Sequence, residues 1–526
     1  MGLPANSTYL TPYKFSLLLK ECIKAKTIEP CKQIHALLLS SSIYWNTFSL
    51  ASKLTGVYAS CGDIISAKSI FRGTQSPNLF AFNWMISALT FHGHHQEALG
   101  YFTLLQESKN FFPNSYTFSF VLKACLGLME LNKGKEVHGL IFKMGSGMDV
   151  SVGNSLIDMY GKCGNIWEAR LVFDEMSKRD VASWTSMICG YSRVGRIEES
   201  VALFERMRLE GVEPNDFTWN AMIAGYARRG DCDNAFMFFS MMCGERLVPD
   251  LVTWNAMISG FVQSQRTGKA FKLFQDMLGS GIRPNQVTVT GLLPACGLIG
   301  SIHRGREIHG FICRMGMDIN AFVASALIDL YSKCGSIRNA RNVFNSISCK
   351  NIASWNAMVR CYGNNGMVDL AVELFQRMQD EGVQANEVTF TSILSSCSHG
   401  GLIDQGLEIF KLMKEYYGIE ASQEHYSSVV DLLCRSGRME EAYDTVKEMP
   451  IEATESIIGA FLNGCMMHER KDLAEKMVED VILKKPGGFV TLSNIYAAEG
   501  DWRQVETVRM LMKDKGVLKM PGSSSL

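Results

Sequence analysis

The chain has 526 residues, of which 47% are hydrophobic and 20% are charged, and its 52 Lys and Arg offset its 53 Asp and Glu. This balance excludes a disordered composition and a long charged tail, and it means that binding to nucleic acid cannot rest on bulk charge. The 16 Cys include no C-x-x-C pair, and the uncharged stretches are broken by Pro, Gly, Asn or Gln. We therefore predict a soluble intracellular or organellar protein with reduced thiols and no membrane span.

The first segment, residues 1–11, precedes the repetitive part of the chain. No acidic residue comes before Glu21, which is typical of transit peptides, but no arginine comes before Arg72. We interpret 1–11 as a short N-terminal segment that is at most the remnant of a transit peptide.

From residue 12 onward the sequence repeats itself. Three consecutive segments of 35 residues, 181–215, 216–250 and 251–285, begin V-A-S-W-T-S-M-I, D-F-T-W-N-A-M-I and L-V-T-W-N-A-M-I. All three end in Pro followed by Asn or Asp. Extending this frame in both directions tiles 12–454 with thirteen units of 31 to 36 residues, which indicates a repeat array.

Each unit contains the signals of two antiparallel helices joined by a tight turn. Ten units carry a glycine at position 15, where a first helix that ends in a left-handed residue needs one. In eleven units the residue at position 20 is an alanine or glycine, which we interpret as a close crossing of the second helix over the first. The glycines at position 15 are Gly62, Gly93, Gly164, Gly195, Gly230, Gly300, Gly335, Gly366, Gly401 and Gly437. The small residues at position 20 are Ala67, Ala98, Ala169, Ala235, Ala270, Ala340, Ala371, Ala442, Gly134, Gly305 and Gly406.

Apolar residues at spacings of three and four follow in the second half of each unit, as in V-A-L-F-E-R-M at 201–207. Each second helix therefore has one apolar stripe. A single hairpin cannot bury such a stripe, so neighbouring hairpins must stack to cover it. The sequence predicts an all-α fold in which the hairpins of 12–454 form a solenoid.

Two kinds of motif distinguish short units from long ones. Two 31-residue units carry Y-x-K-C-G, at 160–164 and 331–335. Longer units carry L-x-x-C and G-x-x-x-H, at 122–125 with 134–138 and at 293–296 with 305–309. These motifs resemble the plant pentatricopeptide-repeat family, and the mixture of P-, L- and S-type units is closest to its PLS subgroup. The resemblance implies a right-handed superhelical α-solenoid of helix–turn–helix repeats.

The last segment, residues 455–526, continues with L-S-N-I-Y-A at 492–497, R-M-L-M at 509–512 and K-M-P-G at 519–522. These motifs look like the E region of organelle RNA-editing factors, so we interpret 455–526 as E-like helical repeats without a deaminase domain. The family commonly reads P-G-x-S-W near this point, whereas this chain reads P-G-S-S-S-L at 521–526.

Residues that could carry catalysis are scarce. A zinc deaminase needs His-x-Glu followed by Cys-x-x-Cys, and this chain has only His95 and Glu97 at the first spacing. We therefore expect no enzyme activity, no cofactor and no metal site. Cysteines and histidines that recur in phase favour a packing role. These residues are Cys22, Cys125, Cys296 and Cys397 in long units, Cys61, Cys163, Cys334 and Cys434 in others, and His35, His138 and His309.

The fifth and last positions of the units are the candidates for base recognition. A helical-repeat RNA reader uses two or three side chains per repeat to recognise one base. The family resemblance implies that Thr or Ser with Asn favours A, Asn with Asp favours U, and Asn with Asn favours C. The pairs that follow this rule are Ser52 with Asn78 (A), Asn83 with Asn114 (C), Asn154 with Asp180 (U), Thr185 with Asn215 (A), Asn220 with Asp250 (U), Asn255 with Asn285 (C), Ser325 with Asn351 (A) and Asn356 with Asn386 (C).

Two points stay open at these positions. Asn and Asp are also common helix caps, so capping alone explains why they stand at the last position of a unit. Capping does not explain the polar residues at the fifth position, inside a helix. The long units and the last short unit match no strong combination, so we assign no base to them. Their pairs are Ser119 with Asp149, Thr290 with Asn320, Thr391 with Ser422, and Ser427 with Thr454.

Position 13, near the end of the first helix, is basic in six units. One cation per repeat can follow a phosphate backbone even in a nearly neutral protein. The alternative is that these cations offset the helix dipole. The candidate phosphate contacts are Lys24, Lys162, Arg193, Arg228, Lys333 and Arg435.

Together these features favour a sequence-specific single-stranded RNA-binding adaptor that specifies sites of organellar C-to-U RNA editing. The resemblance implies single-stranded organellar RNA as one partner. It also implies deaminase-bearing editing proteins and accessory editing factors, recruited in trans through the C-terminal region. An organellar RNA-binding protein for transcript stability, splicing or translation is the alternative, and a protein-binding solenoid of the tetratricopeptide kind is a third hypothesis. The resemblance implies the mitochondrion, or alternatively the chloroplast, as the location.

Overall fold

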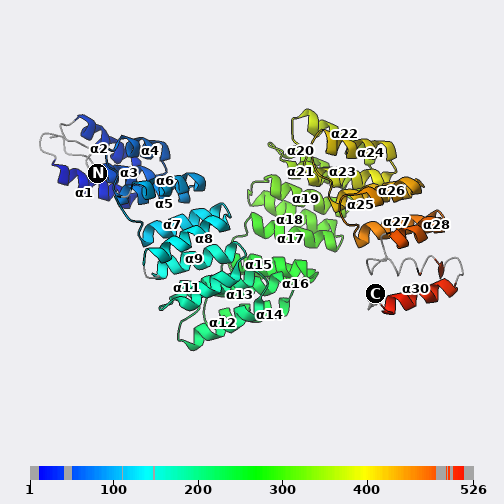
Figure 1. Cartoon of the computed structure of the whole chain (residues 1–526), viewed down its shortest axis with the longest axis horizontal. Helices are drawn as coiled ribbons and strands as arrows, with labels where there is room; N and C mark the ends of the chain where they lie inside the picture. Colours follow the sequence, from blue (N-terminus) through cyan, green and yellow to red (C-terminus); the bar gives the residue numbers. More distant parts are fainter. Residues whose placement is uncertain are drawn as a thin grey trace. The chain divides into compact units, whose positions relative to one another are not determined.

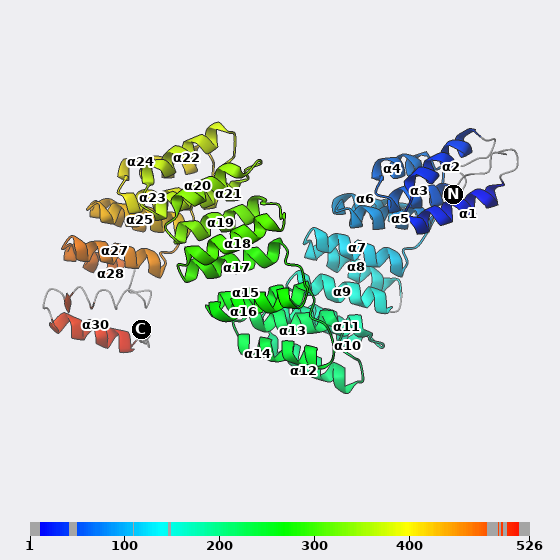
Figure 2. The same cartoon turned by 180° about the vertical axis from the view of Figure 1, so that it is seen from behind.

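The computed structural model describes residues 11–40, 50–108, 110–145, 149–480, 493, 496–497 and 502–514, and every element in these ranges is an α-helix (Figures 1 and 2). The chain splits into two compact units, Met1–Ser264 and Gln265–Leu526. Within each unit, two-helix hairpins follow one another along the chain and pack side by side (Figure 1). The fold is the all-α solenoid of helix–turn–helix repeats that the sequence predicts.

Helix bounds follow the predicted frame of the repeats, with odd-numbered helices as first helices and even-numbered ones as second helices up to α28. The helices of the first unit are α1 (Pro12–Ala25), α2 (Ile28–Ser40), α3 (Leu50–Ser60), α4 (Ile64–Gly73), α5 (Leu79–Phe91), α6 (His95–Glu107), α7 (Ser115–Gly127), α8 (Leu131–Lys143), α9 (Val150–Lys162), α10 (Ile166–Glu175), α11 (Val181–Arg193), α12 (Ile197–Leu209), α13 (Asp216–Arg228), α14 (Cys232–Gly244) and α15 (Leu251–Gln263). Those of the second unit are α16 (Thr267–Gly279), α17 (Gln286–Leu298), α18 (Ile302–Arg314), α19 (Ala321–Lys333), α20 (Ile337–Ser346), α21 (Ile352–Asn364), α22 (Val368–Asp380), α23 (Glu387–Gly400), α24 (Ile403–Glu415), α25 (Gln423–Arg435), α26 (Met439–Glu448), α27 (Glu455–Met467), α28 (Lys471–Asp480) and α30 (Trp502–Asp514).

First helices form the continuous core of each unit. Helix α11, for example, packs on its own second helix α12 and on the neighbouring first helices α9 and α13. Trp184 and Trp219, at position 4 of successive repeats, are fully buried. The ring of Phe173 lies 4.9 Å from that of Trp184, and the ring of Phe204 lies 4.9 Å from that of Trp219, both edge-on. Each phenylalanine comes from the preceding second helix, so each of these repeats buries the tryptophan of the next one.

Every first helix of the thirteen repeats ends in a left-handed residue, whether or not that residue is glycine. All ten glycines predicted at position 15 have positive φ, with Gly93 at 82°. In the three other repeats the same conformation occurs at Lys26 (49°), Met129 (56°) and Gln265 (58°). Because left-handed φ is unfavourable for such side chains, we infer that the packing of the two helices of the hairpin imposes it at Lys26 and Met129.

The small residues at position 20 are buried, and the glycines among them also lie close to the following repeat. A Cβ placed on Gly134 would lie 2.6 Å from the sulfur of Met159, and one on Gly305 would lie 2.8 Å from Cδ2 of Leu330. Met159 and Leu330 belong to the first helix of the following repeat. At Gly134 and Gly305 the nearest atoms therefore belong to the next repeat, whereas at Gly406 a Cβ would lie 2.5 Å from Leu432 of the next repeat and 3.3 Å from Cβ of Cys397 in its own hairpin.

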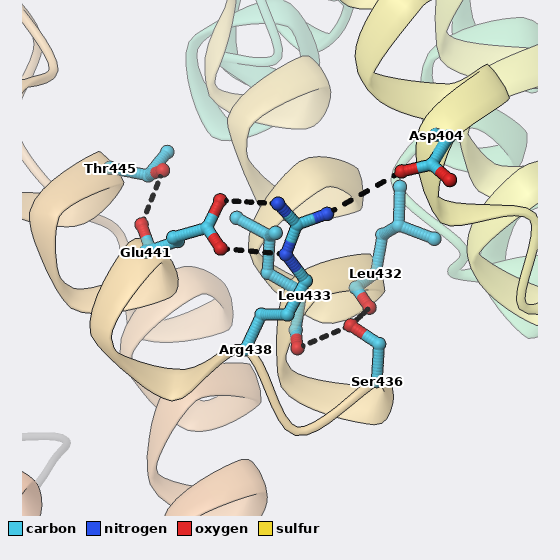
Figure 3. A network of polar contacts seen from close by, with 7 residues as sticks. All are labelled: Asp404, Leu432, Leu433, Ser436, Arg438, Glu441 and Thr445. Carbon is cyan, nitrogen blue, oxygen red and sulfur yellow. Dashed lines mark hydrogen bonds and ion pairs between the residues drawn. The ribbon is translucent and has the colours of Figure 1, made fainter.

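Ion pairs link consecutive hairpins at the entrance to their second helices. Arg438 donates to both oxygens of Glu441, at 2.6 and 2.8 Å, and a third nitrogen lies 3.6 Å from the carboxylate of Asp404 in the preceding repeat (Figure 3). Arg470 makes the same kind of link to Glu440 at 2.6 Å. Because these side chains face solvent, the pairs add little to stability beside the buried core.

Candidate nucleic-acid interface

The fifth and last residues of a repeat, which we call its polar pair, lie together in space in six repeats. The last residue stands directly before the first helix of the next repeat, while the fifth lies one turn inside its own first helix. Stacking of consecutive first helices brings the two side chains into contact. Six pairs are joined by hydrogen bonds, namely Ser52 with Asn78 (2.7 Å), Asn83 with Asn114 (3.3 Å), Asn154 with Asp180 (3.0 Å), Thr185 with Asn215 (3.5 Å), Asn220 with Asp250 (3.2 Å) and Asn356 with Asn386 (3.3 Å).

The sequence predicts two further pairs. The hydroxyl of Ser325 donates to the backbone carbonyl of Ala321 at 2.7 Å, so its partner in this structure is its own helix. Asn255 belongs to the first compact unit and Asn285 to the second, where Asn285 accepts the backbone N–H of Thr288 at 3.0 Å. The base-reading role of all eight pairs stays a prediction.

The last residue of each bonded pair also caps the helix that follows it. Oδ1 of Asn114 accepts the backbone N–H of Thr117 at 3.0 Å, and Oδ1 of Asp180 accepts that of Ser183 at 2.9 Å. Capping occupies Oδ1, which leaves the amide nitrogen of Asn, a donor, or the second oxygen of Asp, an acceptor. Capping and base recognition are therefore compatible, because they use different atoms of one side chain.

The two aspartates of the polar pairs are held in their charged form. Burial acts to raise the pKa of Asp180, but hydrogen bonds from the backbone N–H of Ser183 and the amide of Asn154 outweigh it and lower the pKa. The pKa of Asp250 is lowered in the same way against the effect of burial. The stability that these bonds contribute is present above the ordinary aspartate pKa and is lost as pH falls through the lowered one. At neutral pH both side chains are acceptors.

A third polar position, which the sequence reasoning missed, contacts several of these pairs. It is the third residue of the following first helix, and Thr117, Thr218 and Thr253 at this position have no exposed surface. The signal was present in the sequence as the Ser or Thr shared by V-A-S-W, D-F-T-W and L-V-T-W. Its hydroxyl contacts are Thr117 with Asn83 (2.6 Å), Thr218 with Thr185 (2.7 Å) and Thr253 with Asn220 (2.5 Å).

Exposed apolar side chains at the second position were missed as well. Phe80, Phe217 and Phe322 are 70%, 74% and 72% exposed, and Tyr13, Tyr116, Val252, Val287 and Val388 at the same position are also exposed. A surface cavity of about 770 Å³ opens beside the first polar pair, where Ser52, Asn78 and Phe80 line it. Exposed aromatic and apolar side chains beside polar ones suit the faces of unpaired bases, which stack on such surfaces.

The six predicted cations differ in how their charge is compensated. Four are paired with a carboxylate in the preceding helical turn, namely Lys24 with Glu21 (3.1 Å), Lys162 with Asp158 (2.8 Å), Lys333 with Asp329 (3.0 Å) and Arg435 with Asp431 (2.8 Å). Among the described residues, no carboxylate pairs with Arg193 or Arg228. Burial and the nearby charge of Arg193 lower the pKa of Arg228, which donates to the backbone carbonyl of Ser192 at 3.2 Å. These two arginines, on α11 and α13, are the strongest candidates for phosphate contacts.

The phase-locked histidines and the cysteines of the long units pack as expected, whereas Cys61, Cys163 and Cys334 are only partly buried. Nδ1 of each histidine faces a tyrosine hydroxyl of the next repeat, in His35 with Tyr58 (3.1 Å), His138 with Tyr160 (3.0 Å) and His309 with Tyr331 (2.9 Å). Burial lowers the pKa of all three histidines, so they are neutral at neutral pH. Burial also raises the pKa of Cys125 and Cys296 to about 12, which keeps both thiols protonated.

Within the described ranges, no three His, Cys, Asp or Glu side chains gather where they could hold a metal ion. Glu97 instead forms an ion pair with Lys68 of the preceding repeat. No helix in the same ranges has the length and apolarity needed to cross a bilayer.

Part of the C-terminal segment can be described. Residues 1–10, most of 492–497 and the K-M-P-G motif at 519–522 lie outside the described residues. The hydroxyl of Tyr496 donates to Glu475 of α28 at 3.1 Å. Arg509 of α30 donates to the hydroxyl of Ser493 at 3.2 Å. These two contacts join the motif residues to the helices around them.

Known sequences are similar to this chain over nearly its whole length. The Arabidopsis thaliana pentatricopeptide repeat-containing protein ELI1, chloroplastic, is 38% identical over 522 residues, which are 98% of this chain and 75% of that protein. This chain belongs to the pentatricopeptide-repeat family. The Arabidopsis thaliana pentatricopeptide repeat-containing protein At2g03380, mitochondrial, is 34% identical over 99% of this chain and 66% of its own length.

Family profiles match this pentatricopeptide-repeat protein along much of the array. The PPR repeat family matches 179–219, 214–253, 249–297 and 350–399, and the PPR repeat matches 154–181, 322–352, 388–417 and 424–452. The E motif matches 468–526. The crystal structure of maize PPR10 has a TM-score of 0.59 with 19% identity, over 97% of this chain and 80% of that one. The crystal structure of PPR10 in complex with an 18-nt psaJ RNA element also has a TM-score of 0.59, over 98% of this chain and 81% of that one. At this identity the likeness establishes the fold.

Proposed function

We propose that this protein is a sequence-specific single-stranded RNA-binding adaptor that specifies a site for organellar C-to-U RNA editing. The observation that carries the proposal is the recurrence of bonded polar pairs, six in the described residues, at one place in successive repeats. A protein-binding scaffold has no need to vary Asn, Asp, Ser and Thr at these two positions in combinations that match bases. One repeat then binds one nucleotide.

Each part of a nucleotide has a counterpart on this chain. The base edge meets the polar pair, where Asn offers an N–H and Asp offers a carboxylate oxygen. The base face meets the exposed side chain at the second position, as at Phe217. The phosphate meets cations such as Arg193 and Arg228. From the amino end as 5′, the thirteen units of 12–454, which we assign to the PLS subgroup, should prefer x-A-C-x-U-A-U-C-x-A-C-x-x.

The editing role rests on the C-terminal segment. The match of 468–526 to the E motif supports the assignment of 455–526 as the region that recruits a deaminase-bearing partner and accessory editing factors. The similarity to PPR10, whose structure contains an 18-nt RNA element, supports RNA as the ligand of the array. The chain itself carries no deaminase chemistry, because His95 and Glu97 have no cysteine ligands at the required spacing. The mitochondrion is the proposed location and the chloroplast the alternative, since the relatives include mitochondrial and chloroplastic proteins.

Two measurements test this function. Fluorescence anisotropy at fixed salt should show tighter binding to a thirteen-nucleotide RNA of the proposed sequence than to RNAs of the same composition in shuffled order. Equal affinity for all of them would contradict sequence-specific recognition. Sequencing organellar transcripts from plants that lack the gene should show one or a few cytidines that are no longer converted, each a few nucleotides 3′ of the proposed sequence. Normal editing with lower transcript abundance would favour the role in RNA stability, splicing or translation.

A further inference from the structure

The buried hydroxyl at the third helix position follows the polar pairs along the chain. Ser or Thr occupies this position after seven of the eight repeats with a proposed pair, and Ala81 is the exception. After long repeats the same position holds Val152, Val323 or His425. The hydroxyl residues are Thr117, Ser183, Thr218, Thr253, Thr288, Ser354 and Thr389. A hydroxyl is therefore available where a fifth side chain is proposed to contact a base.

At Asn220 this hydroxyl and Asp250 together fix which way the amide faces. Oγ1 of Thr253 accepts the backbone N–H of Asp250 at 3.2 Å, and its single proton has two acceptors within reach, Oδ1 of Asn220 at 2.5 Å and Oδ1 of Asp250 at 2.9 Å, of which Asn220 is the nearer. The amide nitrogen of Asn220 donates to Oδ1 of Asp250 at 3.2 Å. Rotating the amide by half a turn would set its oxygen against the carboxylate oxygen of Asp250, as it would for Asn154 against Asp180, and would in addition set its N–H against the proton of the Thr253 hydroxyl. The amide oxygen is thus held inward, and one N–H is left for a ligand.

Counting protons at Asn83 gives the same result. Oδ1 of Asn114 already accepts the backbone N–H of Thr117 at 3.0 Å and the amide N–H of Asn83 at 3.3 Å. The hydroxyl of Thr117 has one proton, and the nearer of its two acceptors is Oδ1 of Asn83, at 2.6 Å against 2.9 Å for Asn114. That proton therefore belongs to Asn83 and fixes its amide.

Two other asparagines at the fifth position lack this bond. Oδ1 of Asn154 and Oδ1 of Asn356 are buried and have no hydrogen-bond partner. The hydroxyl of Ser183 donates to Asp180 at 2.9 Å, and that of Thr389 donates to Asn386 at 3.0 Å. Each hydroxyl therefore bonds to the capping residue and not to the asparagine at the fifth position. Only the bond from the amide nitrogen to the last residue orients these two asparagines.

We infer that Thr117 and Thr253 are positioning residues for base recognition by the preceding repeat. Each locks an asparagine with its N–H toward the ligand, where the carbonyl oxygen of a pyrimidine accepts it. The repeats of Asn154 and Asn356, whose amides lack this lock, discriminate less between bases. The inference rests on the proposed function and adds to it that specificity is graded along the chain by a residue of the next repeat.

The repeats of Asn220 and Asn154 form a matched test, because both polar pairs are Asn with Asp and both should prefer U. The full chain is titrated with thirteen-nucleotide RNAs that carry U or A at the nucleotide facing each repeat, the seventh and the fifth. Thr253→Val removes the hydroxyl and keeps the shape of the side chain, while Thr253→Ser retains the hydroxyl. Ser183→Ala is the control, because its hydroxyl bonds only to the cap.

The wild type should prefer U over A more strongly at the seventh nucleotide than at the fifth. Thr253→Val should reduce the preference at the seventh by about three- to tenfold, the effect of losing one orienting hydrogen bond, and Thr253→Ser should restore it. Ser183→Ala should leave the preference at the fifth nucleotide nearly unchanged. Thermal melting of each variant, followed by circular dichroism, reports on the fold separately.

The outcomes distinguish the inference from the function on which it rests. If the wild type shows no preference at either nucleotide, base recognition by the polar pairs is wrong. If the wild type prefers U and Thr253→Val keeps the full preference, or Ser183→Ala loses as much, only the positioning role is wrong. If Thr253→Val does not fold, the same comparison of base preference is made with Thr117→Val and RNAs that differ at the third nucleotide. Loss of folding in both would overturn the inference, because the hydroxyl would then be purely structural.

Discussion

Replacing Asn356 by Thr should change the base that one repeat prefers without altering the fold. Asn356 is 4% exposed, and its amide nitrogen donates to Asn386 at 3.3 Å. The combination of Thr with Asn already exists in this chain as Thr185 with Asn215. Asn356→Thr reproduces that combination, so the repeat should shift from C toward A.

The structure indicates that the substitution is tolerated. In the repeat of Thr185, the hydroxyl bonds to the hydroxyl of Thr218 at 2.7 Å and lies 3.5 Å from Asn215. Thr389 stands at the position of Thr218 for Asn356, so a hydroxyl there has a partner. The substitution also removes the buried Oδ1 of Asn356, which has no partner. We therefore expect the free energy of unfolding to change by less than about 1 kcal/mol.

The change in base preference should be larger than that structural effect. A mismatched base costs about 1–3 kcal/mol, which corresponds to roughly 5- to 150-fold in affinity. Fluorescence anisotropy with RNAs that differ only at the eleventh nucleotide, C or A, measures the ratio directly. The tenth nucleotide, which faces the repeat of Ser325, serves as an internal control and should keep its preference. An unchanged ratio of C to A binding in Asn356→Thr would show that this pair does not recognise a base.

Four other predictions concern phosphate contacts, the hairpin turn, the C-terminal segment and metal content. Arg228→Gln should weaken the binding of all RNAs about equally and reduce the slope of log affinity against log salt by about 0.7. Lys333→Gln should have a smaller effect, because Lys333 is paired with a carboxylate. A loss of affinity confined to some sequences would contradict a phosphate contact. Met129→Gly should raise the free energy of unfolding in urea by about 1 kcal/mol, and Gly93→Ala should lower it by a similar amount. If both variants are as stable as the wild type, the left-handed turn carries no strain. Deleting 455–526 should abolish editing in plants and leave RNA affinity nearly intact; a parallel loss of RNA binding would place the segment in the RNA-binding surface or its folding. The purified chain should contain no zinc and should not deaminate RNA, and stoichiometric zinc would contradict this.

The sequence predicts the hairpin frame well because the signals that set it are local. A glycine at position 15 ends a helix through its own φ, and all ten predicted glycines have the expected conformation. The same conformation at Lys26 and Met129 could not be predicted, because no residue preference points to it. There the packing of the two helices, which a single residue does not encode, imposes the turn.

Contacts between repeats are the part that sequence reasoning could not resolve. The sequence pattern assigns Gly134 to a crossing within its own hairpin, whereas the atom that excludes a side chain there belongs to Met159 of the next repeat. Thr253 does not stand out in the sequence, because a Thr at the third position of a helix is explained by local capping. Its contact with Asn220, 33 residues earlier, exists only once the hairpins are stacked. The two positions of each polar pair could be proposed from the sequence because the family frame already relates them, whereas the hydrogen bonds between them are visible only in the stacked repeats.

In the mode of recognition that we propose, one side chain caps a helix with one atom and meets a base with another, so we expect the array to change its target without changing its fold. At Asn215 and Asp250 the same atom, Oδ1, accepts the N–H of the following helix, at 3.0 and 2.9 Å. Exchanging Asn for Asp retains that bond and the start of the helix, because both residues are good N-caps. The exchange alters only the side-chain atom that does not take part in capping, which is an N–H donor in Asn and a carboxylate acceptor in Asp. Since the free atom is the one available to a base, our proposal predicts that a mutation nearly neutral for stability changes the nucleotide that the repeat accepts.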